Sequence, residues 1–177
     1  MELQGDKVRL RTADDSDVED LYSWWNDREF YGEFSRFDPK TRPEIEAMVK
    51  RKEMRLFIIM SLSGDKKIGF IDYSLPRPTR PNLFEIGYRI KPEERRKGYT
   101  TDATRLLVDH LFTTEKSERV EALTETGNIA SQRVLEKNGF KREGEMRNRA
   151  FNNGQYKNEY MYGLPREDWQ SSRESSE

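Results

Sequence analysis

The stretch RRKGYTTDA at residues 95–103 combines the residue types with which proteins bind phosphate. Two arginines and a lysine supply positive charge, and Gly98 lacks a Cβ atom, so that the backbone can approach a ligand closely. The segment 100–112 has helical apolar spacing, and the first N–H groups of a helix lack intrahelical partners. A basic, glycine-containing loop between a strand and the start of a helix is therefore well suited to bind a pyrophosphate. The predicted contacts are Arg95, Arg96, Lys97, Gly98, Tyr99 and Thr100.

Two established nucleotide-binding motifs do not fit this stretch. A Walker loop has the pattern G-x-x-x-x-G-K-[ST], whereas Lys97 here precedes Gly98, and the chain contains no G-x-G-x-x-G. An ordinary exposed turn with solvated cations is the alternative interpretation. The residues of the stretch alone leave both interpretations open.

The composition excludes several other classes of site. The chain has 177 residues, with 32 Lys plus Arg against 33 Asp plus Glu, so no global field attracts nucleic acid or an anionic membrane. The absence of cysteine excludes disulfides, thiolate metal sites and a cysteine nucleophile. His110 is the only histidine, which excludes an H-E-x-x-H zinc site, and its helical position predicts a packing role. No metal is expected.

The start of the chain carries no secretory or membrane signal. MELQGDKVRL has no apolar core of the signal-peptide kind, and no apolar run approaches ~18 residues. We therefore expect a cytoplasmic protein that binds neither membrane nor nucleic acid.

The candidate phosphate-binding stretch at 95–103 must be positioned by the elements around it, which begin with a strand and a helix. KVRLRTA at 7–13 alternates as a strand does, and DDSD at 14–17 offers helix-capping side chains. The helix that follows is expected to bury the residues that recur at helical spacing: Val18, Leu21, Tyr22 and Trp25. This prediction leaves Trp24 off the buried face.

A second helix and a hairpin follow. TRPE at 41–44 is a capping box, which predicts a helix start. The apolar segments 55–62 and 68–75 are separated by SGDKK and predict a hairpin of two buried strands. The proline-rich segment 76–82 is predicted to be a stiff loop.

The strand at 82–90, NLFEIGYRI, precedes the candidate phosphate-binding stretch at 95–103. Its alternation predicts Phe84, Ile86, Tyr88 and Ile90 on one face and Glu85, Gly87 and Arg89 on the other. Beyond the helix at 100–112, the sequence predicts a strand at 119–125, a short helix within 128–140 that its glycine ends, and a hairpin at 142–163 that turns at NNG. We expect one domain over residues 1–170 and a disordered tail at 171–177.

The loop at 95–100 and the segment at 128–140 together resemble two motifs of the GNAT superfamily of acyl-CoA N-acyltransferases. Within that superfamily the resemblance is to the RimJ/RimL branch of ribosomal-protein N-terminal acetyltransferases. The family's R/Q-x-x-G-x-G/A loop is matched at Arg95 and Gly98, with Thr100 in place of the last small residue. Arg96 stands where close relatives often have glycine. The family's N-x-x-S-x-x-V-x-E-K-x-G-F segment is matched by Asn128, Ser131, Val134, Glu136, Lys137, Gly139 and Phe140.

The resemblance implies an α/β fold, with a mixed and mostly antiparallel twisted sheet and helices on both faces. It also implies acetyl-CoA as co-substrate. Two parallel strands would separate, and pantetheine would bind along the backbone of Tyr88, Arg89, Ile90 and Lys91. The amides of residues 96–100 would hold the pyrophosphate.

Amine acylation by direct attack requires a neutral amine, a polarised thioester and a proton for the thiolate. Glu85 is the candidate base; because a free glutamate has a pKa near 4.3, useful basicity would require burial. The resemblance assigns Asn128 to the cofactor arm and Ser131 to the sulfur. A tyrosine could instead supply that proton, and the candidates are Tyr88, Tyr156 and Tyr160. Trp24 is the candidate wall of the acceptor pocket.

The branch favours the N-terminal α-amine of a protein as acceptor. Polyamines, aminoglycosides and amino acids are alternative acceptors within the same enzyme class. A non-catalytic acyl-CoA-binding module is the alternative outside it. A homodimer and a monomer both remain open.

Overall fold

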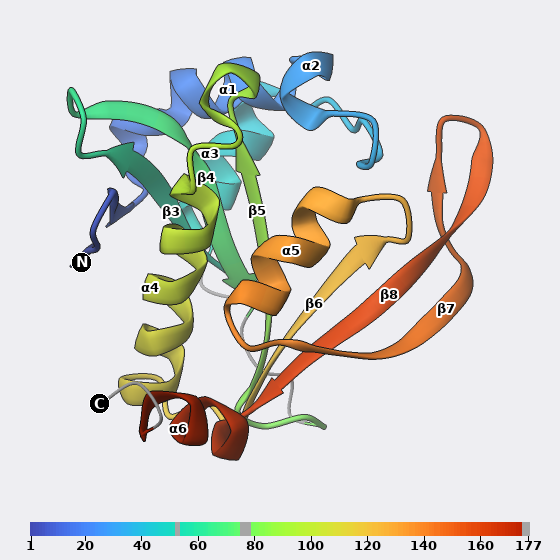
Figure 1. Cartoon of the computed structure of the whole chain (residues 1–177). Coiled ribbons are helices and arrows are strands. Elements are labelled where there is room, and N and C mark those ends of the chain that lie inside the picture. The colour runs from blue at the N-terminus through green and yellow to red at the C-terminus, as the bar shows by residue number, and fades with distance from the viewer. Residues whose placement is uncertain (52–53, 75–78, 175–177) are drawn as a thin grey trace.

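A computed structural model describes residues 1–51, 54–74 and 79–174. Figure 1 shows a twisted mixed sheet with helices on both faces, which confirms the predicted fold class. The strands are β1 (Glu2–Gln4), β2 (Val8–Thr12), β3 (Met54–Ser61), β4 (Lys66–Ser74), β5 (Leu83–Ile90), β6 (Arg119–Glu125), β7 (Lys141–Asn152) and β8 (Gln155–Pro165). Their order in the sheet is β1-β2-β3-β4-β5-β6-β8-β7, and all described neighbours pair antiparallel except β5 and β6.

Helices cover the two faces of this sheet. They are α1 (Val18–Trp25), α2 (Arg28–Tyr31), α3 (Arg42–Lys50), α4 (Tyr99–Thr113), α5 (Ile129–Lys137) and α6 (Arg166–Glu174), with 3-10 turns η1 (Asp15–Asp17) and η2 (Pro92–Glu94). The core on one face joins the sheet to α4 and α5, and the core on the other face joins it to α1, α2 and α3. No helix in the described ranges is long and apolar enough to cross a membrane.

The predicted boundaries are confirmed where the signals are local. Thr41 and Glu44 form a reciprocal capping box at the start of α3. Gly139 follows α5 with φ 83°, and Asn153 and Gly154 turn the β7–β8 hairpin with φ 51° and 75°. His110 is buried beside Phe57, as a packing role requires.

The prediction for Trp24 is wrong. Trp24 is only 6% exposed and its ring stacks on Phe30, whereas Tyr22 is 36% exposed. Both Trp24 and Trp25 follow Leu21 at helical spacing, and the face that packs on the sheet includes both. Trp24 is therefore a core residue, although Lys91 lies above its ring at 5.5 Å.

The end of the chain also differs from its prediction. Residues 171–174, expected to be disordered, belong to α6. The ring of Trp169 stacks on Phe112 at 4.9 Å and its Nε1 donates to Asp109, so α6 is attached to the end of α4. Residues 175–177, and Pro76 and Pro78 of the predicted loop, lie outside the described residues.

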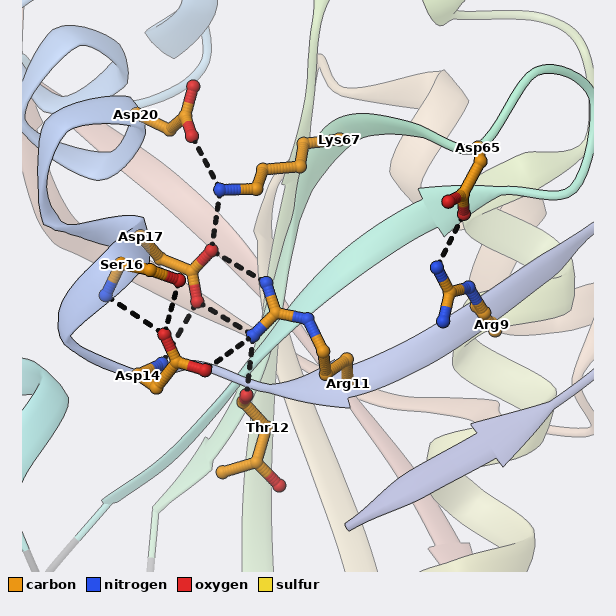
Figure 2. A network of polar contacts seen from close by, with 9 residues as sticks. All are labelled: Arg9, Arg11, Thr12, Asp14, Ser16, Asp17, Asp20, Asp65 and Lys67. Carbon is orange, nitrogen blue, oxygen red and sulfur yellow. Dashed lines mark hydrogen bonds and ion pairs between the residues drawn. The ribbon is translucent and has the colours of Figure 1, made fainter.

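A network of buried charges attaches α1 to the sheet (Figure 2). The Asp17 carboxylate is fully buried and accepts two hydrogen bonds from Arg11 at 2.7 and 3.0 Å. Lys67 of β4 lies 2.8 Å away, and the Asp14 N–H donates at 2.9 Å. Burial alone would raise the pKa of Asp17, but these donors hold it below its ordinary value.

Candidate active site

The strands β5 and β6 are paired over only part of their length. Their parallel register runs from Leu83 opposite Arg119 to Glu85 opposite Glu121. From there to Ile90, β5 has no described partner strand on this side. Figure 1 shows the two arrows diverging toward their carboxyl ends. Because α4 follows β5 and α5 follows β6, both helices begin at the open end of this split.

The backbone of β5 presents alternate residues to the split. The Lys91 N–H donates to the Ile68 carbonyl of β4 at 2.9 Å, in the same register that pairs Ile90 with Gly69. Hydrogen-bonded pairs alternate in an antiparallel ladder, so the backbone groups of Arg89 and Lys91 face β4 and those of Tyr88 and Ile90 face the split. Of the four residues predicted to contact pantetheine, Tyr88 and Ile90 have backbone groups that face the split, whereas those of Arg89 and Lys91 face β4.

The stretch at 95–103, predicted to bind phosphate, forms the N-terminal start of α4. Gly98 is the N-cap residue with φ 83°, and it makes no side-chain cap, so the first N–H groups of the helix have no capping partner there. Arg96 has φ 63°, a left-handed conformation that favours glycine, which is the residue that the family resemblance leads us to expect at this position. Thr100 is the second residue of the helix and does not cap it.

The cations of this stretch have different partners. The Arg95 guanidinium donates to the carbonyls of Glu29 and Phe30, so it holds α2 in place. Lys97 pairs with Glu94 at 2.8 Å. Within the described ranges Arg96 makes no ion pair and is exposed.

Lys7 is a further cation near the N-terminus of α4 that the sequence did not indicate. Its Nζ donates to the Lys97 carbonyl at 3.0 Å, and a Cβ atom on Gly98 would lie 3.0 Å from it. Since Lys7 lies ninety residues before this loop, no local motif could have indicated the contact.

Tyr88 and Ser131 meet on the α5 side of the split. Their hydroxyl oxygens are 2.8 Å apart, and burial raises the pKa of Tyr88 to about 12, although its hydrogen bond with Ser131 opposes the shift. The Asn128 Oδ1 accepts from the Ser131 N–H and caps α5, which leaves the Asn128 amide NH₂ as a donor. Of the other candidate tyrosines, Tyr156 is 68% exposed on the distal hairpin and Tyr160 packs under Arg142.

Glu85, Gly87 and Arg89 lie on the opposite face, beside α2. Glu85 is exposed and therefore lacks the burial that its predicted basicity requires. The Arg89 guanidinium lies over the rings of Tyr31 and Phe70, at 4.4 and 5.9 Å, and its Nε is buried without a partner among the described residues. The sequence placed these β5 residues on one face correctly.

Asp72 of β4 joins this face. It is paired with Gly87 in the sheet, and a Cβ atom on Gly87 would lie 3.3 Å from its Oδ1. Asp72 was missed because it lies in a segment predicted to be a buried strand. The signal that could have found it is Gly87, a residue without a side chain inside a well-patterned strand, which marks a place where a neighbour needs room.

Loops close over the end of β6. Asn152 of the hairpin donates to the Glu125 carboxylate at 2.7 Å and to the Glu33 carbonyl at 2.8 Å. Phe34 lies against Gly127, where a Cβ atom would be 2.9 Å from its ring. These contacts connect the loop after α2 with the β6–α5 turn and the hairpin tip, so the split is bordered on this side by three segments distant in sequence.

The sequence and the fold both match known acetyltransferases. A family model described as an acetyltransferase (GNAT) domain matches residues 7–141. A Bacillus subtilis protein named Probable N-acetyltransferase YjcK is 30% identical over 174 residues, covering 92% of this chain and 96% of its own.

Solved structures share the fold at lower identity. The ribosomal-protein-S5-alanine acetyltransferase of Vibrio fischeri has a TM-score of 0.84 at 19% identity, with 96% of this chain and 98% of that chain covered. The spermidine N-acetyltransferase of Vibrio cholerae, solved with CoA and spermine, has a TM-score of 0.82 at 18% identity, with 92% and 98% covered. The motifs, the split sheet and these matches lead to one conclusion, that the chain belongs to the GNAT family of N-acetyltransferases.

Proposed function

We propose that this enzyme transfers the acetyl group of acetyl-CoA directly to a primary amine, with the N-terminal α-amine of a protein as the first candidate acceptor. The observation that supports the proposal is the split between β5 and β6. It has hydroxyl groups, Tyr88 and Ser131, on one face and carboxylates, Asp72 and Glu85, on the other. A donor and an acceptor that enter from opposite faces would meet there.

The donor side has the groups that acetyl-CoA requires. Its pyrophosphate would be held by the N–H groups at the start of α4, which no described side chain caps, with Arg96 and Lys7 adding positive charge. The backbone groups of Tyr88 and Ile90 would pair with the amides of the pantetheine arm. Acetyl-CoA supplies the activated thioester, and the protein supplies orientation.

The Tyr88–Ser131 pair fits the departure of the thiolate. With its pKa raised to about 12 by burial, Tyr88 keeps its proton at neutral pH and can donate through Ser131 or directly. Asn128, whose side-chain oxygen caps α5, would use its amide NH₂ toward the cofactor arm.

The acceptor side admits two classes of amine. A hollow of about 560 Å³ between α2 and the hairpin, lined by residues that include Gly32, Phe37 and Asn153, would receive the first residues of a polypeptide. A small polycation is the second candidate. It is favoured by carboxylates around the end of the split: Asp72, Glu85, Glu125 and Glu159.

A single incubation tests the proposal. Purified protein is mixed with acetyl-CoA and a pool of N-terminal peptides, polyamines and aminoglycosides, and products are identified by mass spectrometry while free CoA is measured. Acetylated peptides support the first candidate, and acetylated polyamines alone support the second. No acetylated product, with acetyl-CoA still bound in a calorimetric titration, would instead indicate a non-catalytic binding module.

A further inference from the structure

The Asp72 carboxylate occupies a space that the neighbouring strand leaves empty. Asp72 and Gly87 are direct partners across β4 and β5, and a Cβ atom on Gly87 would lie 3.3 Å from Oδ1 and 3.6 Å from Oδ2. The carboxylate thus lies over the backbone of β5, between the side chains of Glu85 and Arg89 on the same face. Tyr88, whose backbone faces the split, is the next residue along β5.

This carboxylate lacks the partners that a structural carboxylate would have. Across the described part of the chain, no hydrogen bond or ion pair reaches it. Arg89 lies near enough to attract it but has its guanidinium over the Tyr31 ring of α2, at 4.4 Å. On the other side β3 presents Leu56, which is buried and apolar. Asp72 is half-buried, so a small ligand can still reach it.

We propose that Asp72 binds the ammonium group of the acceptor and takes one of its protons. The inference deepens the proposed function and rests on it. One N–H bond of the ammonium breaks and an O–H bond forms on Asp72, which leaves a neutral amine. The amine lone pair then forms the C–N bond to the acetyl carbon as the C–S bond breaks, and the departing thiolate takes a proton from the Tyr88–Ser131 pair. The nitrogen loses its second N–H proton, which leaves a neutral amide and restores the hydroxyl pair through water, and Asp72 releases its own proton to solvent.

Electrostatics make Asp72 better suited to this role than Glu85. Burial raises the pKa of Asp72 to about 7, the Arg89 charge opposes the shift and the Glu85 charge adds to it. A base with a pKa near the working pH is both deprotonated and able to accept a proton. Glu85 is exposed, and its charge contributes by strengthening the proton affinity of Asp72.

The test compares Asp72→Asn with Glu85→Gln in the full chain, using acetyl-CoA and the best amine found in the pool. We expect Asp72→Asn to lower kcat/KM by about a hundredfold or more, as the loss of a general base does. In the wild type, kcat/KM should rise about tenfold per pH unit below pH ~7 and then level, and this limb should disappear in Asp72→Asn. Asp15→Asn, the same change at an exposed site that pairs with Lys50, is the matched control.

A second measurement does not depend on activity. In protein with ¹³C-labelled aspartate carboxyls, the signal missing from Asp72→Asn identifies Asp72, and we expect it to titrate near pH 7. Calorimetry with acetyl-CoA verifies that Asp72→Asn is folded and binds the donor within about threefold of the wild type.

Each outcome separates the two proposals. If the wild type acetylates an amine but Asp72→Asn keeps its rate and its pH limb, or the Asp72 carboxyl titrates below pH 5, the role of Asp72 is overturned and the enzyme proposal stands. A loss confined to Glu85→Gln would assign the base to Glu85 instead. If the wild type acetylates no amine, the proposed function fails and Asp72 loses its role with it.

Discussion

Two aspartates of the sheet region, the buried Asp17 and the half-buried Asp72, show how the same side chain stabilises the fold in one place and is available for chemistry in another. Asp17 has no exposed surface and is held by Arg11, Lys67 and the Asp14 N–H (Figure 2). Asp72 is half-buried on β4, where its two neighbours along the strand, Ile71 and Tyr73, are buried. No described residue donates a hydrogen bond to it. Burial acts on both, but the partners lower the pKa of Asp17 while that of Asp72 rises to about 7.

The contrast extends beyond the two carboxylates. Around Asp17 the polar groups are paired with one another across β2, η1, α1 and β4. Around the split, Arg89 has a buried nitrogen without a partner in the part of the chain that the structure describes. Arg96 has a left-handed backbone, and Gly98 begins α4 without a side-chain cap. Locally unfavourable features gather at functional sites, because a ligand completes them.

The largest effect on stability is expected from removing the Asp17 carboxylate from its network of hydrogen bonds and ion pairs. Asp17→Ala leaves Arg11 and Lys67 partly buried without their shared carboxylate, so we expect the free energy of unfolding to fall by about 3–5 kcal/mol. Urea denaturation measures it. Asp20→Asn removes only the more exposed partner of Lys67 and should cost about 1 kcal/mol or less. Equal losses in the two variants would contradict the central role of Asp17.

The pH dependence of stability should have opposite signs at the two sites. The folded-state pKa of Asp72 is raised from 3.8 to about 7, so its ionisation opposes folding increasingly as pH rises from about 4 to 7. We expect Asp72→Asn to be more stable than the wild type by about 2 kcal/mol at pH 8, after allowing for solvent screening, and unchanged at pH 4. Urea denaturation at both pH values provides the comparison.

For Asp17 the sign reverses. Its folded pKa is lowered, so its contribution is present above the unfolded value of 3.8 and is lost as pH falls below it. The destabilisation by Asp17→Asn should therefore shrink in acid, whereas the gain from Asp72→Asn grows toward alkaline pH. A pH-independent difference for Asp72→Asn would mean that its carboxylate is better solvated than its position indicates.

In both regions the sequence predicted the features that local patterns determine. DDSD at 14–17 indicated a capped helix, and Asp14 and Asp17 do form a reciprocal cap at η1. The alternation in NLFEIGYRI placed Glu85 and Arg89 correctly, and Asn128 and Ser131 lie at the predicted helix start. Signals within about four residues were sufficient for these elements.

The remaining site features depend on contacts between distant segments. The environment of Asp72 depends on a register that aligns it with Gly87, and Lys7 reaches the α4 entrance from the start of β2. Arg95 matches the family motif, yet its side chain donates hydrogen bonds to backbone carbonyls of α2. Trp24 was misplaced because helical spacing alone allows either edge of the stripe to be buried.

A smaller effect should separate the two faces of the split. Tyr88→Phe and Ser131→Ala each remove one hydroxyl of the pair on the thiolate side, and we expect each to lower kcat about tenfold, or ~1.4 kcal/mol. The double variant should be little worse than either single variant, because the two hydroxyls act together. Steady-state kinetics measures these losses, and the pH limb assigned to Asp72 should remain in all three. Additive losses would show that the hydroxyls act independently.

The smallest effect should come from the strained entrance of α4. Arg96 has φ 63°, which costs a non-glycine residue about 1 kcal/mol, so Arg96→Gly should raise the free energy of unfolding by up to about that amount. Arg96→Ala keeps the strain and removes the same charge, so its stability should stay within about 0.5 kcal/mol of the wild type.

If the guanidinium contacts the pyrophosphate, both variants should bind acetyl-CoA severalfold more weakly at low salt, and the difference should narrow at high salt because the site is exposed. Calorimetric titration at two salt concentrations distinguishes the two cases. If Arg96→Gly is more stable but binds acetyl-CoA more weakly, the strained backbone of Arg96 is tolerated because its guanidinium binds the ligand. Unchanged binding in both variants would assign the phosphates to Lys7 and the helix N–H groups alone.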